Sequence, residues 1–156
     1  MYDKLTLRKL VEEVLSKYNS FSLNTPAAVN LIMGTIAHES HMGKFRKQIK
    51  GPARGIIQME PATEKDIWEN YLRYKLGLSL AITLRAGVKG PDPVQMQHND
   101  PYAIIMCRVH YLRVPAKLPD ADNIQALAEY WKKHYNTSLG KGTVLKFMND
   151  YKRFLS

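Results

Sequence analysis

The chain has 156 residues, which is enough to bury a hydrophobic core without disulfide or metal staples. Hydrophobic residues make up 45% and charged residues 24%, a composition that excludes an intrinsically disordered protein. The 23 basic and 14 acidic side chains give a formal net charge of +9, which favours an anionic partner such as nucleic acid, anionic lipid or an acidic cell-wall polymer. We expect one folded domain over residues 1–156.

A single cysteine, Cys107, excludes an intrachain disulfide, and its apolar neighbours predict a position in the core. The first residues follow an amphipathic pattern, without an apolar run that would serve as a signal peptide or membrane span. We therefore expect synthesis in the cytoplasm and no membrane insertion. Action on a cell wall would then need another route, such as assembly into a virus particle or release through a membrane lesion.

The first two predicted helices differ in their surroundings. Apolar side chains at a 3.6-residue period predict an amphipathic helix over residues 4–18. Thr25 followed by Pro26 is a typical helix start, and the segment after it is almost wholly apolar as far as Glu39. Gly43 marks the end of this second helix. The second helix should therefore be central and buried.

Loops and helices alternate in the middle of the chain. Residues 44–54 are polar and basic with Gly51-Pro52, and the short run Gly-Ile-Ile-Gln follows at residues 55–58, which predicts an irregular loop or a small β lobe. A third helix opens at Pro61, and another apolar segment over residues 78–86 is also predicted to be helical. Residues 87–99 contain two glycines and two prolines, so we expect a loop there.

Three more helices are predicted in the last third of the chain. The apolar period indicates helices over residues 100–112, from about residue 123 to 131, and over residues 144–155. Residues 134–142, which separate the last two, are polar and contain glycine, and Tyr135 is expected to leave the preceding helix. The predicted fold class is therefore all-α, mainly helical, with one small irregular or β lobe.

A polar run, His38-Glu39-Ser40-His41, interrupts the apolar second helix near its end. A carboxyl in this place is held on rigid backbone and can face a cleft. Partial burial would penalise its ionised form and raise its pKa, so that Glu39 stays protonated near neutral pH as a general acid requires. The alternative is a surface glutamate near the helix end, where its charge is mildly unfavourable. Position alone does not decide between the two.

The two histidines beside Glu39 invite comparison with a zinc site. A zinc-protease helix has histidines at i and i+4 with the glutamate directly after the first. Here His38 and His41 are three residues apart, and no third ligand is evident nearby. We therefore expect no metal and no cofactor, with both histidines lining a cleft or the helix end.

Further motifs follow Glu39-Ser40 in a fixed order. Residues 55–63, Gly-Ile-Ile-Gln-Met-Glu-Pro-Ala-Thr, resemble the Gly-Leu-Met-Gln-x-x-Pro-x-Thr signature of the lytic-transglycosylase (goose-type lysozyme-like) family. The longer string over residues 51–61 is most similar to phage and prophage members. Residues 100–102, Asp-Pro-Tyr, and residues 135–137, Tyr-Asn-Thr, follow in the family's order, the latter resembling a Tyr-Asn-Ala-Gly motif.

This resemblance implies a lysozyme-like fold that cleaves peptidoglycan glycan strands. Glu39 would protonate the oxygen between N-acetylmuramic acid and N-acetylglucosamine, and would then take the proton of the muramic C6 hydroxyl as a 1,6-anhydro ring closes. Oriented polar groups in the cleft would stabilise the oxocarbenium-like transition state. The residues implied to contact substrate are Ser40, Gln58, Met59, Tyr135 and Asn136.

Two segments depart from the family pattern. The small, often serine-bearing stretch that follows the glutamate in the family is replaced by the basic and bulkier residues 44–50. Ser138 stands where a glycine is expected after Tyr-Asn-Ala. Substrate contacts should therefore differ at these two places.

Three alternatives stay open. A hydrolytic muramidase with the same Glu39 would usually employ a second carboxylate, for which Glu60, Glu64 and Asp66 are candidates, although each also suits a helix start. A non-catalytic cell-wall-binding or phage structural protein, with virion or tail components as partners, could retain the fold without turnover. Nucleic-acid binding would fit the charge but lacks a groove-reading motif, so no specific nucleic acid is expected.

Overall fold

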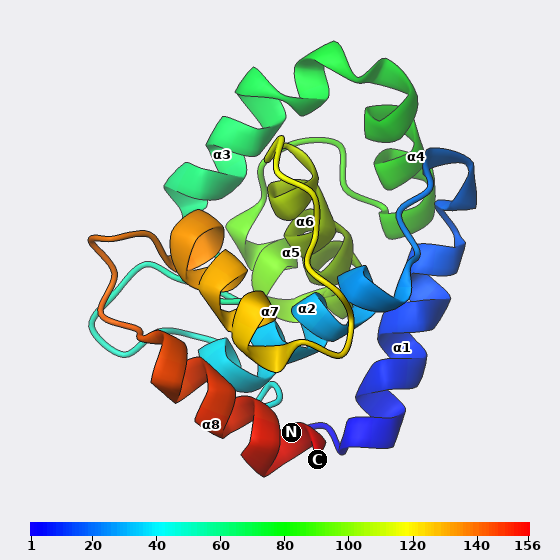
Figure 1. Cartoon of the computed structure of the whole chain (residues 1–156). Helices are drawn as coiled ribbons and strands as arrows, with labels where there is room; N and C mark the ends of the chain where they lie inside the picture. Colours follow the sequence, from blue (N-terminus) through cyan, green and yellow to red (C-terminus); the bar gives the residue numbers. More distant parts are fainter.

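Eight α-helices account for most of the chain in the computed structural model, which describes residues 1–156 (Figure 1). The structure is 63% helical and contains no strand or sheet, so the predicted all-α class is confirmed. Single turns of 3₁₀-helix occur at Asn19–Phe21 and Leu72–Tyr74, and a π-helical turn at Lys132–Asn136 continues the seventh helix. The α-helices are α1 (Lys4–Ser16), α2 (Pro26–Ser40), α3 (Pro61–Asn70), α4 (Leu76–Ala86), α5 (Pro93–His98), α6 (Asp100–Leu112), α7 (Ile124–Trp131) and α8 (Val144–Leu155).

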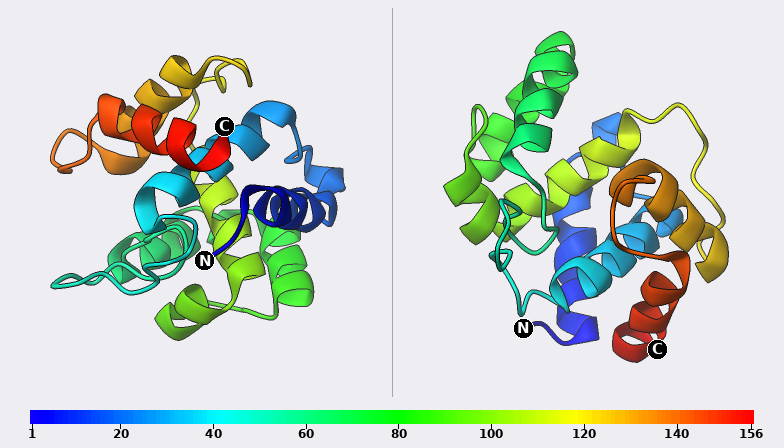
Figure 2. Two further views of the ribbon diagram at one scale, coloured as in Figure 1. Left: turned by 90° about the horizontal axis from the view of Figure 1, so that it is seen from below. Right: turned by 90° about the vertical axis from the view of Figure 1, so that its left-hand side faces the viewer.

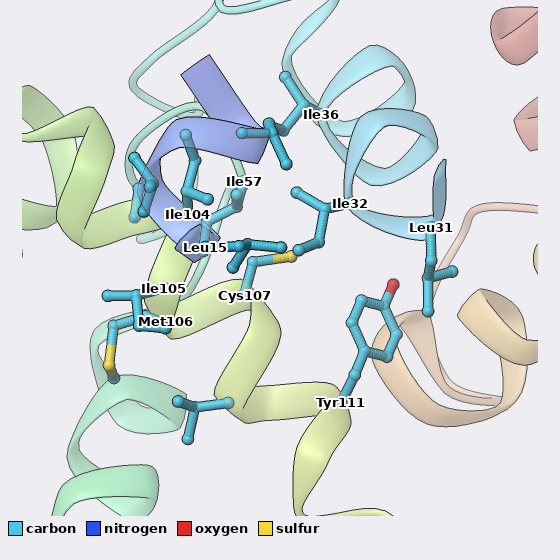
Figure 3. Close-up of a cluster of buried hydrophobic side chains, with 14 of the residues drawn as sticks. Leu15, Leu31, Ile32, Ile36, Ile57, Ile104, Ile105, Met106, Cys107 and Tyr111 are labelled. Carbon is cyan, nitrogen blue, oxygen red and sulfur yellow. The ribbon is translucent and has the colours of Figure 1, made fainter. Parts of the chain in front are cut away.

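Helices α2 and α6 form the centre of the fold because they are apolar on nearly every side. Figure 3 shows Cys107 of α6 between Ile32 of α2 and Leu15 of α1. The thiol is completely buried, and burial raises its pKa, so Cys107 is a core residue as expected. The same core includes Ile56 and Ile57 from the irregular lobe, which fixes that lobe against the helices.

Side-chain caps explain where several helices begin. The Thr25 hydroxyl accepts a hydrogen bond from the Ala28 N–H at 3.2 Å, with Pro26 at the first helical position of α2. The segment predicted as a loop over residues 87–99 contains a short helix, α5, which corrects that prediction. Asp92 caps it by accepting from the Gln95 N–H at 3.1 Å. The helix-start signal Asp92-Pro93 therefore determines the local structure in spite of the glycines that precede it.

The irregular lobe lies between α2 and α3 and has two isolated β-bridges, Lys47 with Arg54 and Arg54 with Met59. The backbones of Arg54 and Met59 exchange two hydrogen bonds of 3.0 Å. Arg46 anchors the lobe to the start of α6 through bidentate bonds of 2.5 and 2.8 Å to Asp100, and the Tyr2 hydroxyl donates to the same carboxylate. The prediction of a small irregular lobe therefore holds, without a regular strand.

The first helix and the C-terminus are in contact, because the Lys4 ammonium donates to the Ser156 main-chain oxygen at 2.9 Å. Both termini lie at the lower end of the molecule in the view of Figure 1. None of the helices combines the length and the apolar character that a membrane crossing requires.

Helix α8 packs closely on α2 at Gly34. A Cβ atom built on Gly34 would lie 2.5 Å from Phe147 Cζ and 2.9 Å from Tyr151 Cδ2, well inside van der Waals contact. Both aromatic rings are part of the core, so they have little freedom to move aside. Helices α2 and α8 can therefore pack this closely only because Gly34 has no side chain.

We predict that Gly34→Ala lowers the free energy of unfolding by about 1–3 kcal/mol, because overpacking outweighs the better helix propensity of alanine. Gly90→Ala is the matched control, since nothing lies within 4 Å of a Cβ there. Urea unfolding of both variants measures the difference. A Gly34→Ala protein that is as stable as the parent would contradict the packing.

Candidate functional site

A cleft of about 610 Å³ lies between the irregular lobe and the loop over residues 137–143. Figure 2 shows this lobe (cyan to green) and this loop (orange) on the same side of the molecule. The floor and walls come from α2, the lobe, the start of α3, α6 and the end of α7. The lining residues are His38, Glu39, Gln48, Ala53, Gln58, Met59, Glu60, Thr63, His110, Tyr135, Asn136, Thr137, Leu139, Gly140, Lys141 and Gly142.

Glu39 is the penultimate residue of α2 and lines this cleft. The side chain is partly exposed, but its Oε2 atom is buried and has no hydrogen-bond partner, and neither has the indole N–H of Trp131. Burial raises the pKa of Glu39 to about 7, and the nearby Trp131 indole lowers it by a smaller amount. The carboxyl can therefore be protonated near neutral pH and can give up its proton.

Ser40 lies behind the cleft rather than in it. Its hydroxyl is completely buried, donates to the Ile56 carbonyl at 2.6 Å, and accepts from the Gly43 N–H at 2.9 Å. Ser40 is not among the lining residues, so the expected substrate contact is corrected to a structural one. The hydroxyl joins the end of α2 to the lobe and so helps to place Glu39.

Gln58 and Met59 are neighbours in the chain, and both line the cleft. The Gln58 amide donates to the carbonyls of Phe45 at 3.0 Å and Gly55 at 2.9 Å, with the backbone of Gln58 at a positive φ of 48°. Its Oε1 atom accepts no hydrogen bond from the protein, so it remains available to a ligand. Met59 is 3% exposed and contributes apolar wall.

Tyr135 was expected to leave the helix, but it lies in the π-helical turn that continues α7. Its hydroxyl donates to the Ile57 carbonyl at 2.6 Å, and its ring packs edge-on against His110 at 4.9 Å between centroids. Burial raises the pKa of this phenol well above its usual value. Tyr135 thus lines the cleft and also ties the end of α7 to the lobe.

Lys132 organises the loop on the other side of the cleft, and the sequence analysis missed it. Its ammonium donates to Asn136 Oδ1 at 2.7 Å and to the carbonyls of Gly140 and Gly142 at 3.0 and 2.7 Å, which uses all three donors. A Cβ on Gly142 would lie 2.5 Å from Trp131 Cη2. Gly140 and Gly142 were therefore the only sign of this loop structure in the sequence, because glycine lets the loop backbone approach α7 closely.

The histidines beside Glu39 have different environments. His38 lines the cleft, with Nδ1 2.7 Å from Asp150 Oδ2. Burial lowers the pKa of His38, while the hydrogen bond to Asp150 opposes this shift. His41 lies between the rings of Phe45 and Phe154 and is not among the lining residues. No group of three or more His, Cys, Asp or Glu side chains that could hold a metal occurs in the structure.

His110 lies in the cleft without any sequence signal that could have found it. It contacts Tyr135 and lies 3.2 Å from an Arg113 nitrogen through Nδ1. Burial lowers its pKa to about 4, so the ring is neutral at neutral pH. Because the Arg113 guanidinium can only donate, Nδ1 accepts, and the neutral ring carries its proton on Nε2, where it can donate one hydrogen bond without adding charge.

Of the three candidates for a second carboxylate, Glu60 alone lines the cleft, where it is exposed. Glu64 is 1% exposed and accepts hydrogen bonds from the Tyr102 hydroxyl at 2.5 Å and the Asp92 N–H at 3.0 Å. Asp66 pairs with Arg113 at 2.6 Å outside the cleft. Glu39 is therefore the one buried carboxyl of the cleft.

Comparisons of the chain with protein-family models, curated proteins and solved structures found no match. The chemistry of the site therefore rests on its own geometry. One buried carboxyl with a pKa near neutrality faces a cleft with amide, imidazole and hydroxyl groups from distant parts of the chain. Such an arrangement can protonate a leaving group and then accept a proton from a nucleophile.

We predict that Ser40→Ala lowers the free energy of unfolding by about 1–3 kcal/mol, because the buried Ile56 carbonyl and Gly43 N–H lose their partner. Ser138→Ala is the control, since that serine is exposed and makes no side-chain hydrogen bond. Denaturant unfolding measures both. Equal stability of the two variants would show that the Ser40 link contributes nothing.

Proposed function

We propose that this chain is a lytic transglycosylase that cleaves the glycan strands of peptidoglycan, with Glu39 as its single acid and base. The observation that carries the proposal is the buried Glu39 carboxyl, whose pKa is raised to about 7, in one cleft with Gln58, Met59, Tyr135 and Asn136. These residues are far apart in sequence. The motif resemblance and this geometry both support Glu39 as the acting carboxyl.

In the first step, protonated Glu39 donates its proton to the oxygen between N-acetylmuramic acid and N-acetylglucosamine. The bond from muramic C1 to that oxygen breaks, and the N-acetylglucosamine end leaves as an alcohol. Positive charge develops at C1, and the newly formed Glu39 carboxylate would stabilise it electrostatically.

In the second step, the Glu39 carboxylate takes the proton of the muramic C6 hydroxyl while that oxygen bonds to C1. The product is a 1,6-anhydro ring, and Glu39 is again protonated. No water and no second carboxylate are consumed. A pKa near 7 suits both steps, because proton transfer in either direction is then nearly balanced.

The other cleft groups would orient the sugar. Lys132 donates a hydrogen bond to Asn136 Oδ1. The amide N–H donors of Asn136 would therefore be available to an N-acetyl carbonyl of the substrate. Gln58 Oε1 is available to a sugar hydroxyl. Tyr135 acts through position, since its hydroxyl holds the lobe that carries Gln58.

A hydrolytic muramidase is the second candidate function, and the specific observation that favours it is Glu60 at the cleft wall. In that reaction Glu60 would act as base on a water molecule or stabilise C1. Both reactions share Glu39 as acid, so they differ in their products.

The setting of the activity belongs to the same proposal. Residues 51–61 are similar to phage and prophage members of the lytic-transglycosylase family. We therefore propose a virion-associated or released protein that acts on the cell wall. The net charge of +9 complements the acidic peptides and polymers of a bacterial envelope.

The test is mass spectrometry of muropeptides released from purified peptidoglycan. We expect the parent protein to release products with 1,6-anhydro ends, and Glu39→Gln to reduce the rate by about 10²–10⁴-fold, because the acid is lost while the shape is kept. Glu60→Gln is the matched carboxyl-to-amide control and should release the same anhydro products.

Other outcomes would replace the proposal. Reducing ends in place of anhydro ends, together with loss of activity in Glu60→Gln, would establish hydrolysis. Binding of intact glycan without release by the parent or by Glu39→Gln would establish a non-catalytic cell-wall-binding protein.

A further inference from the structure

Helix α4 carries a row of exposed leucines on the side of the molecule away from the cleft. Leu76, Leu80 and Leu84 recur every four residues and are 77%, 60% and 70% exposed. We call these three residues the leucine ridge. Tyr74, which is 71% exposed, extends it. The core does not require these side chains, because α4 is already anchored by a separate buried face containing Leu78 and Ile82.

The segment that carries the leucine ridge has charges of one sign only. Residues 73–89 contain four basic side chains and no acidic one. All four, Arg73, Lys75, Arg85 and Lys89, are exposed. An apolar row on a segment whose only charged side chains are cations is complementary to a surface that is apolar beneath an anionic layer.

An apolar hollow of about 270 Å³ adjoins the leucine ridge. Its only charged lining residue is Lys75, and Leu76 belongs to both the hollow and the ridge. The lining residues are Phe21, Tyr71, Lys75, Leu76, Gly77, Leu78 and Leu112. A cation at the edge of an apolar hollow suits a ligand with an anionic head and an apolar chain.

We propose that α4 docks on an anionic lipid bilayer. The leucine ridge would enter the boundary between headgroups and acyl chains, and the basic residues around it would contact lipid phosphates. The helix has 11 residues, so it lies on the surface and does not span. A second copy fits less well, because two such faces would bring like charges together and α4 is too short for a coiled coil.

The position of α4 keeps the cleft open in this arrangement. Figures 1 and 2 show α4 on the side of the molecule opposite the irregular lobe and the loop over residues 137–143. Docking through the leucine ridge therefore leaves the cleft facing away from the bilayer. The inference stands without the proposed reaction, since none of its residues lines the cleft.

Vesicle co-sedimentation of the full chain tests the proposal. We expect binding to vesicles of phosphatidylglycerol and phosphatidylcholine, weakening with salt, and little binding to phosphatidylcholine alone. Leu76→Gln/Leu80→Gln/Leu84→Gln should reduce the bound fraction at least about tenfold, because glutamine keeps the helix propensity and removes the apolar surface. Leu5→Gln/Leu145→Gln, at exposed leucines elsewhere, is the control and should bind as the parent does.

Equal binding by the triple variant, or no binding to phosphatidylglycerol vesicles at low salt, would overturn the proposal. Sedimentation velocity without vesicles identifies the other occupant: a dimer that only the triple variant loses would establish a second copy in place of the bilayer. Glu39→Gln should bind vesicles as the parent does, so failure of the membrane proposal and failure of the proposed reaction are distinguishable.

Discussion

Two neighbouring carbonyls in the irregular lobe, those of Ile56 and Ile57, each accept a hydrogen bond of 2.6 Å from a hydroxyl on a helix. Ser40 at the end of α2 holds the first, and Tyr135 at the end of α7 holds the second. The side chains of both isoleucines are completely buried, so hydrogen bonding and packing fix the same two residues. This attachment gives a lobe without regular strands a defined place, and it positions Gln58 and Met59 across from Glu39.

Burial has a cost at Glu39. It raises the pKa of the carboxyl to about 7 from an ordinary 4.5. Because the folded pKa lies above the unfolded one, the folded state loses stability as the pH rises from 4.5 to 7, by up to ~3 kcal/mol in total. A buried carboxyl without a partner of opposite charge is typical of functional sites, where stability is exchanged for reactivity.

Local patterns in the sequence predicted most of the fold, because apolar periodicity and caps such as Thr25-Pro26 act over a few residues. The resemblance to the lytic-transglycosylase motifs added Gln58 and Tyr135-Asn136 to Glu39 as expected site residues, and all four line one cleft. Helix α5 was not predicted because Gly87 and Gly90, which precede its Asp92-Pro93 start, indicate a loop. Ser40 was misassigned because adjacency to Glu39 does not reveal which way a side chain faces. Lys132 and His110 act through contacts that the chain makes only when folded, so no local pattern marks them.

The central claim is that the fold keeps Glu39 protonated close to neutral pH. The most direct measurement is an NMR titration of the carboxyl carbons in protein labelled with ¹³C-glutamate, with the Glu39 signal assigned by its absence in Glu39→Gln. The account predicts a midpoint near 7 for Glu39. A midpoint near 4.5, the ordinary value for a glutamate, would contradict it.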